Sequence, residues 1–276
     1  PRESADSFPF AFKNMKEVSI IDFPGGGSLP PALIAASPEA ILVIQHSAPD
    51  DELKAVFHGL ALTTVYGHEL KSIFQPLVKK FGGHILPRRL YDTSAAAKIL
   101  HFSQTSDEYL PDLKNLLQAY IRPVHIPPEL RETFQKAEDI ALHQALLMPY
   151  LHKELMVESR KRFGSTLPVE IENEFLPELI RIEAAGIPVD AASLTPKLPP
   201  LGRSEAELKD VMEAAIGKSI DARNAIKKEL QAVQSEMRFI KAFTQTKDGR
   251  VYATFNPYSC SSGRMSTRDP NVQGIR

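Results

Sequence analysis

No common catalytic signature organises the residues of this sequence that could do chemistry. The sequence lacks a GxxxxGK(S/T) phosphate loop, an HExxH zinc motif and a GxSxG serine motif. Its eight histidines are scattered without ligand spacing, which favours surface or satisfied core roles. The one cysteine, Cys260, cannot form an internal disulfide or a zinc site, which indicates a reducing compartment.

The most informative polar stretch runs from residue 248 to residue 275. From residue 256 onward it is polar, contains glycine and shows no strong periodicity.

Strand and helix patterns alternate upstream of this stretch, which predicts an α/β fold. The run 40–44 is continuously apolar and β-branched, as in a strand buried on both faces, and 60–66 predicts a second such strand. Residues 18–21 predict an edge strand before a Pro-Gly turn. Helices are expected over 50–58, 68–81, 93–100 and 109–120.

The second half of the chain is expected to be mainly helical. A long helix should begin near Pro128, and another should span 170–185 and end at Gly186. The proline-rich segment 195–202 predicts a linker, and Ser204 with Glu207 predicts a capping box that opens the next helix. A strand is expected over 251–255.

The last predicted helix has one apolar side and one basic side. Its apolar positions step by four and three residues, a seam suited to pairing with another helix: Ile226, Leu230, Val233, Met237 and Ile240. Its outer face carries cations that could contact DNA or simply be solvated: Arg223, Lys227, Lys228, Arg238 and Lys241. Residues 202–276 have a net charge of +4 and residues 1–201 of −5, which permits a polyanion ligand.

Three blocks of the 248–275 stretch resemble family A DNA polymerases, the DNA polymerase I type, where the thumb leads into the palm. The blocks are DGRVYATFNP at 248–257, SSGRMS at 261–266 and DPNVQGI at 269–275. The resemblance implies that this region holds primer–template DNA. An arginine after a glycine, as at Arg264, can lie along the DNA minor groove and donate to acceptors that every base pair presents at similar places, and Asn271 and Gln273 could do the same without choosing a sequence. The alternative is that these side chains only fasten a loop through backbone hydrogen bonds. The DNA-binding residues it implies, with the two thumb lysines, are Arg264, Asn271, Gln273, Asn256, Ser266, Lys227 and Lys228.

The resemblance extends backwards and sets the expected domains. Residues 175–190 resemble the segment that opens the family's polymerase portion. We therefore expect a ribonuclease H-like 3′–5′ exonuclease-type domain over 1–163, the start of the polymerase domain with a helical thumb over 164–247, and the beginning of the palm over 248–276.

The exonuclease-like domain resembles the family without its metal ligands. Gln45 and Ser47 stand where the first motif has Asp and Glu, and Ile73 stands in place of the acid of the second motif. Only Asp139 of the third motif remains. One carboxylate cannot hold two Mg²⁺ ions, so the domain is expected to be inactive unless nearby Glu69 rescues a site.

The family's catalytic palm carboxylates and fingers helix do not occur before Arg276. The resemblance implies a DNA-directed DNA polymerase of replication or repair, without proofreading, whose Mg²⁺ and deoxynucleotide triphosphates bind the remaining palm and fingers. This chain alone is expected to be inactive and to bind no metal. The alternative is a non-catalytic duplex-DNA-binding or scaffold protein. No membrane segment is evident, and an intracellular, DNA-containing compartment is expected.

Overall fold

The computed structural model describes residues 15–23, 32–37, 40–101, 112–121, 137–214, 220–244, 246, 248–257 and 265–274. These residues form two compact units. The first contains the described residues up to Ala184, and the second contains those from Ala185 to Pro257 and from Met265 onward. The domain boundary expected after residue 163 falls in the turn between two helices, and the compact units part 21 residues later.

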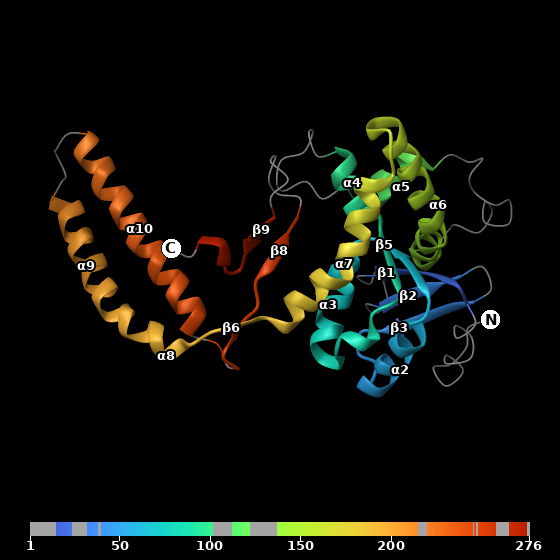
Figure 1. Cartoon of the computed structure of the whole chain (residues 1–276), viewed down its shortest axis with the longest axis horizontal. Helices are drawn as coiled ribbons and strands as arrows, with labels where there is room; N and C mark the ends of the chain where they lie inside the picture. Colours follow the sequence, from blue (N-terminus) through green and yellow to red (C-terminus); the bar gives the residue numbers. More distant parts are fainter. Residues whose placement is uncertain are drawn as a thin grey trace. The chain divides into compact units, whose positions relative to one another are not determined.

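The first unit is built on a five-stranded mixed sheet with the order β3-β2-β1-β4-β5 (Figure 1). Strands β1, β2 and β3 form an antiparallel meander, and β4 and β5 run parallel to β1. An α/β class was expected, and the mixed sheet with its helices agrees. The strands are β1 (Glu17–Phe23), β2 (Ala32–Ala36), β3 (Ile41–Gln45), β4 (Thr64–Gly67) and β5 (Arg89–Asp92).

Helices cover both faces of this sheet. Helices α2 (Asp50–Leu60), α3 (Leu70–Phe81) and α7 (Leu167–Ala185) share one core with Ile20 of β1. Helix α6 (Ala137–Phe163) packs on the other face, where Ile21 meets Met148. Helices α4 (Thr93–His101) and α5 (Leu113–Tyr120) pack against α6 in a third cluster, and the 3-10 helix η2 (Gly83–Ile85) follows α3.

The position of two strands differs from the sequence-based expectation. The run 40–44 was expected to be buried on both faces, but β3 is an edge strand among the described residues, and Val43 is 52% exposed. Like β2, strand β1 is covered on both faces, although it was expected at an edge. Ser19 of β1 is polar but buried, and this polar residue made the strand look less central in the sequence than it is in the sheet.

The strand expected over 60–66 is also wrong in extent. Leu60 ends α2, Leu62 is 84% exposed in the following turn, and β4 begins only at Thr64. Strands β2 and β5 were not expected. Short runs of apolar residues do not distinguish a helix end from a strand, because both are buried on one side.

A buried carboxylate joins β5 to three helices. The two oxygens of Asp92 accept backbone hydrogen bonds from Glu69 (3.0 Å), Leu70 (2.9 Å) and Ser94 (2.8 Å), at the starts of α3 and α4. The backbone N–H of Asp92 donates to the side-chain carbonyl of Asn173 in α7 (2.8 Å). Helix starts carry N–H groups without partners in the helix, so Asp92 stabilises two helix starts at once.

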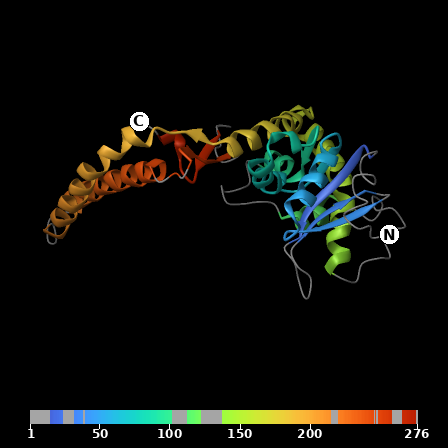
Figure 2. The same cartoon turned by 90° about the horizontal axis from the view of Figure 1, so that it is seen from below.

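The second unit contains an antiparallel pair of long helices, α9 (Leu198–Ala214) and α10 (Ile220–Thr244) (Figures 1 and 2). They follow the short helix α8 (Ala191–Leu194) and the 3-10 helix η5 (Thr195–Lys197). The expected seam of α10 is confirmed, since these two helices contact each other along their length. No helix in the described part of the chain is both long and apolar enough to cross a membrane.

The expected linker over 195–202 is wrong, because these residues are helical. Pro199 and Pro200 lie in the first turn of α9, where the missing N–H of a proline costs nothing. The expected capping box is wrong for the same reason. Ser204 lies inside α9, and its hydroxyl donates to the carbonyl of Pro200 (3.2 Å).

Two small strand pairs complete the second unit. Strand β6 (Ile187–Pro188) pairs with β7 (Arg250–Val251), and β8 (Thr254–Asn256) pairs with β9 (Ser266–Arg268), which precedes the 3-10 helix η6 (Val272–Gly274). The single strand expected over 251–255 is therefore split. Its two ends find different partners.

Candidate nucleic-acid interface

Helix α10 carries a continuous row of cationic and amide side chains on one flank of its seam. With 3.6 residues per turn, steps of four and three residues place six side chains in one row about 27 Å long. We call this row the basic stripe, and it consists of Arg223, Lys227, Gln231, Gln234, Arg238 and Lys241. Its four cations are exposed, and the row contains no acidic residue. Such a row can contact several phosphates of one nucleic-acid backbone.

Lys228 does not belong to the basic stripe. It follows Lys227 directly, so it points about 100° away around the helix. Both lysines are exposed, and neither forms an ion pair within the described part of the chain. The structure therefore separates two residues that were expected to act together.

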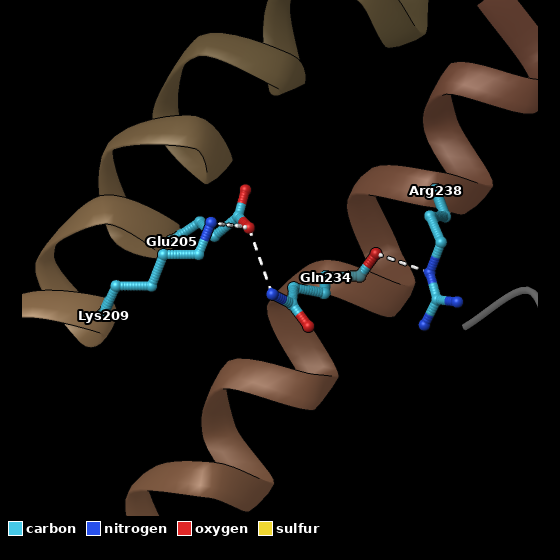
Figure 3. A network of polar contacts seen from close by, with 4 residues as sticks. All are labelled: Glu205, Lys209, Gln234 and Arg238. Atoms are coloured by element: carbon cyan, nitrogen blue, oxygen red, sulfur yellow. Dashed lines mark hydrogen bonds and ion pairs between the residues drawn. The ribbon is translucent and has the colours of Figure 1, made fainter. Parts of the chain in front are cut away.

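A polar network fixes the stripe relative to α9 (Figure 3). Glu205 of α9 accepts a hydrogen bond from Nε2 of Gln234 (3.1 Å) and pairs with Nζ of Lys209 (2.7 Å). The hydrogen bond from Lys209, followed by that from Gln234, lowers the pKa of the Glu205 carboxyl. Arg238 Nε donates to the backbone carbonyl of Gln234 (3.3 Å). Glu205, the carboxylate that bonds to the stripe among the described residues, thus also pairs with a cation of its own helix.

The loop after β9 carries two of the residues expected to contact DNA. Asn271 Oδ1 accepts from the hydroxyl of buried Thr267 (3.0 Å) and from the backbone N–H of Gln273 (3.1 Å). Gln273 Nε2 donates to the carbonyl of Met265 (2.7 Å). Asn271 Oδ1 and Gln273 Nε2 therefore do fasten the loop, as the alternative expected. The side chains of Asn271 and Gln273 nevertheless remain exposed. Ser266 and Asn256 face each other across the β8–β9 pair, and Arg264 lies outside the described residues.

Among the described positions expected to replace the exonuclease acids, Ile73 lies apart from Gln45 and Ser47. Gln45 ends the edge strand β3 and Ser47 lies in the turn after it, where its hydroxyl donates to Gln45 Oε1 (3.4 Å). The Gln45 side chain shares the face of Val43, whereas Ile73 is buried on the opposite face with Ile44. Strand β3, which carries Gln45, is at the edge of the described sheet rather than at its centre, and the assignment of Gln45 and Ser47 to the first motif stays a prediction.

The described residues of the first unit do not fit a pair of Mg²⁺ ions. On the central strand β1, Ile21 packs against α6, and Glu17 at the start of the strand accepts a hydrogen bond from the hydroxyl of Tyr66 (3.3 Å). The Asp92 oxygens are already used by three backbone N–H groups. No group of three or more His, Cys, Asp or Glu that could hold a metal occurs among the described side chains. Asp139 lies in the first turn of α6, and its side chain is outside the described residues.

Sequence reasoning missed two residues that organise the second unit. Thr267 holds the loop that carries Asn271 and Gln273, and Arg250 bonds to the end of α7. The sequence predicted the turn at Asp248-Gly249 but not the role of Arg250. In that turn the backbone N–H of Arg250 donates to Asp248 Oδ1 (3.1 Å). Its partner carbonyls lie 64 and 65 residues earlier, beyond the reach of any local pattern.

The fold thus consists of a mixed α/β sheet unit and a unit with a helical pair, which carries the basic stripe, and a polar loop. No family model matches this sequence, and no curated protein matches it either. Among solved structures, the fold is similar to the structure described as the POL domain of Pol1 from M. smegmatis in complex with DNA primer-template and dNTP. The TM-score is 0.64 and the sequence identity 19%, and the match covers 100% of this chain and 56% of that chain. This chain spans little more than half the length of that neighbour.

Proposed function

We propose that this protein is a family A DNA-directed DNA polymerase that grips primer–template DNA and does not proofread. In this proposal, residues 1–163 are the ribonuclease H-like exonuclease-type domain, 164–247 include the thumb, and 248–276 begin the palm. The observation that carries it is the fold similarity along the whole chain to a polymerase POL domain that was solved with DNA primer-template and dNTP. The three sequence blocks at 248–257, 261–266 and 269–275 support it independently.

The proposal assigns DNA contacts to two described parts of the second unit. The cations of the basic stripe would bind successive phosphates, which gives affinity without sequence preference. The exposed amides of Asn271 and Gln273 would approach the minor groove near the growing end, with Asn256, Ser266 and Arg264. Lys228, which points away from the stripe, would contribute less than Lys227.

The proposal assigns no nuclease chemistry to the first unit. Cleavage by two metals needs carboxylates that hold both ions, and the described side chains do not supply that set. Mg²⁺ and deoxynucleotide triphosphates would bind palm and fingers residues outside this sequence, in an intracellular compartment that contains DNA. Polymerisation would therefore need more than these 276 residues.

The DNA contacts are tested by fluorescence anisotropy with a labelled primer–template duplex at several salt concentrations. Replacing both Lys227 and Arg238 by alanine should lower affinity and reduce the slope of log K against log salt by about 1 per lost phosphate contact. The matched control is Lys228→Ala, which removes one exposed cation from the same helix and should change the slope little. The single variants Lys227→Ala and Arg238→Ala complete the comparison. If Lys228→Ala lowered the affinity and the salt slope as much as either of them, the assignment of the stripe would be contradicted.

The enzymatic part is tested with the whole polymerase, Mg²⁺, four deoxynucleotides and a 5′-labelled primer with a mismatched end. Extension without shortening is the expected result. Shortening that Asp139→Ala abolishes would show an active exonuclease. Duplex binding without extension would favour the scaffold alternative.

A further inference from the structure

The two ends of the helical pair meet at the C-terminal end of α7. The chain leaves α7 at residue 186, forms α8, η5, α9 and α10, and returns at residue 249. There, the backbone N–H of Val189 donates to the carbonyl of Gly249 (2.9 Å), and β6 pairs with β7. The chain segments that enter and leave the helical pair are thus bonded to each other, and we call this meeting point, at β6 and β7, the root of the helical pair.

Arg250 bonds this root to α7. Its Nε donates to the carbonyl of Ala185 (2.6 Å) and its Nη2 to the carbonyl of Gly186 (3.1 Å). The last carbonyls of a helix have no donors within the helix, and the helix dipole makes them the negative end. A planar guanidinium can serve two such carbonyls together, which the single ammonium of a lysine does less well.

Further contacts fix the shape of the residues around Arg250. Asp248 Oδ1 accepts from the backbone N–H of Arg250, and Asp248 Oδ2 accepts from the hydroxyl of Tyr252. Gly249 has a φ of +68°, which a glycine adopts without strain. We call the bonded group of Ala185, Gly186, Asp248, Arg250 and Tyr252 the root clasp.

We propose that Arg250 is a positioning residue that sets where the basic stripe lies, without itself contacting DNA. This inference rests on the proposed function. Two of the guanidinium nitrogens donate to the carbonyls of Ala185 and Gly186, so the group is already engaged within the second unit. Helix α10 contacts β7, and its buried residues, Ile240 and Phe243, lie at the end nearest to the clasp. A shift of β7 is therefore passed to α10 and to Lys241, nine residues before Arg250.

The test compares Arg250→Gln with the conservative Arg250→Lys in two measurements. The first is dissociation of a labelled primer–template duplex as a function of salt, and the second is amide hydrogen exchange. For Arg250→Gln we expect about tenfold weaker binding, mainly from faster dissociation, because a lost charge-assisted hydrogen bond is of that order. The salt slope should stay unchanged, since no phosphate contact is removed. Arg250→Lys should recover part of the affinity.

Hydrogen exchange separates this role from a general loss of stability. In Arg250→Gln, exchange should rise in peptides that contain Val189, whose N–H bonds across the root, and stay unchanged in α3 of the first unit. A salt slope lower by about 1 would overturn the proposal, because it would show a direct phosphate contact. Unchanged exchange at the root, or raised exchange with unchanged affinity, would also overturn it.

Failure of the proposed function gives a different result. If the unsubstituted protein does not bind the duplex at any salt concentration, the proposed function fails, and the positioning role fails with it. The exchange measurement still reports whether Arg250 holds the root. If the unsubstituted protein binds and only the Arg250 outcomes differ from expectation, the positioning role alone is wrong.

Discussion

The aromatic ring of Tyr252 lies against the Cα of Gly186. A Cβ on residue 186 would stand 2.8 Å from Cε1 of Tyr252 and 3.1 Å from the carbonyl oxygen of Val251. Gly186 also has a φ of +67°, in the left-handed region that favours glycine. Glycine is therefore required at this helix end for both backbone conformation and space.

Replacing Gly186 by alanine is expected to destabilise the protein by about 2 kcal/mol or more, because strain in the backbone adds to the clash with the ring. Urea-induced unfolding measures this loss. The matched control is Gly202→Ala inside α9, where an added Cβ would meet nothing within 4 Å. That change should stabilise by up to about 1 kcal/mol through helix propensity. Similar effects at both positions would contradict the role of Gly186.

His152 makes the stability of the first unit depend on pH. Its ring packs 4.4 Å from that of Tyr91 and 5.5 Å from that of Tyr66, and its Nδ1 has no hydrogen-bond partner among the described groups. Burial lowers its pKa from the ordinary 6.5 to about 4, against a smaller opposing effect of Glu170. The unfolded chain therefore binds more protons between these two values.

Lowering the pH through this window should cost a total of about 3 kcal/mol of stability, while above about pH 6.5 this residue contributes no pH dependence. His152→Phe should flatten the dependence of the unfolding free energy on pH between 4 and 6.5. His84→Gln, which changes an exposed histidine, serves as the control and should leave that dependence intact. An unchanged slope in His152→Phe would show that other groups cause the acid sensitivity.

A buried ion pair links α3 to α7. Lys71 Nζ lies 2.9 Å from Oε1 of Glu183, whose side chain is only 4% exposed. Lys71→Met should cost about 3 kcal/mol, because it leaves a buried carboxylate without its cation. Lys80→Met, which breaks the exposed pair with Asp50, should cost less than about 1 kcal/mol. Chemical unfolding of both variants tests the difference, and equal losses would contradict it.

The hydroxyl of Thr267 holds the loop after β9. It donates to Asn271 Oδ1 (3.0 Å) and accepts from the backbone N–H of Gln273 (3.2 Å). Thr267→Val keeps the shape and should cost about 1–2 kcal/mol, since buried polar groups lose their partner. Thr254→Val in the paired strand is the control, because its hydroxyl bonds to nothing in the described part of the chain. Thermal unfolding that does not distinguish the two would refute the role of Thr267.

Features that depend on near neighbours along the chain were predicted correctly. The expected helices over 50–58, 68–81 and 93–100 correspond to α2, α3 and α4, and the end of α7 at Gly186 is confirmed. The seam of α10 is confirmed as well. These features follow from residues three or four apart and from the conformation of single glycines, and such information is local.

The central position of β1 and the contacts between distant groups could not be predicted from local patterns. The apolar run of β3 looks more buried than β1, yet the sheet order places β1 inside, because burial depends on neighbours from elsewhere in the chain. The bond from Arg250 to Ala185 spans 65 residues and leaves no periodic trace in the sequence. Lys227 and Lys228 are adjacent in sequence, but the turn of the helix separates them, and the contact of α10 with α9 decides which flank of α10 stays open.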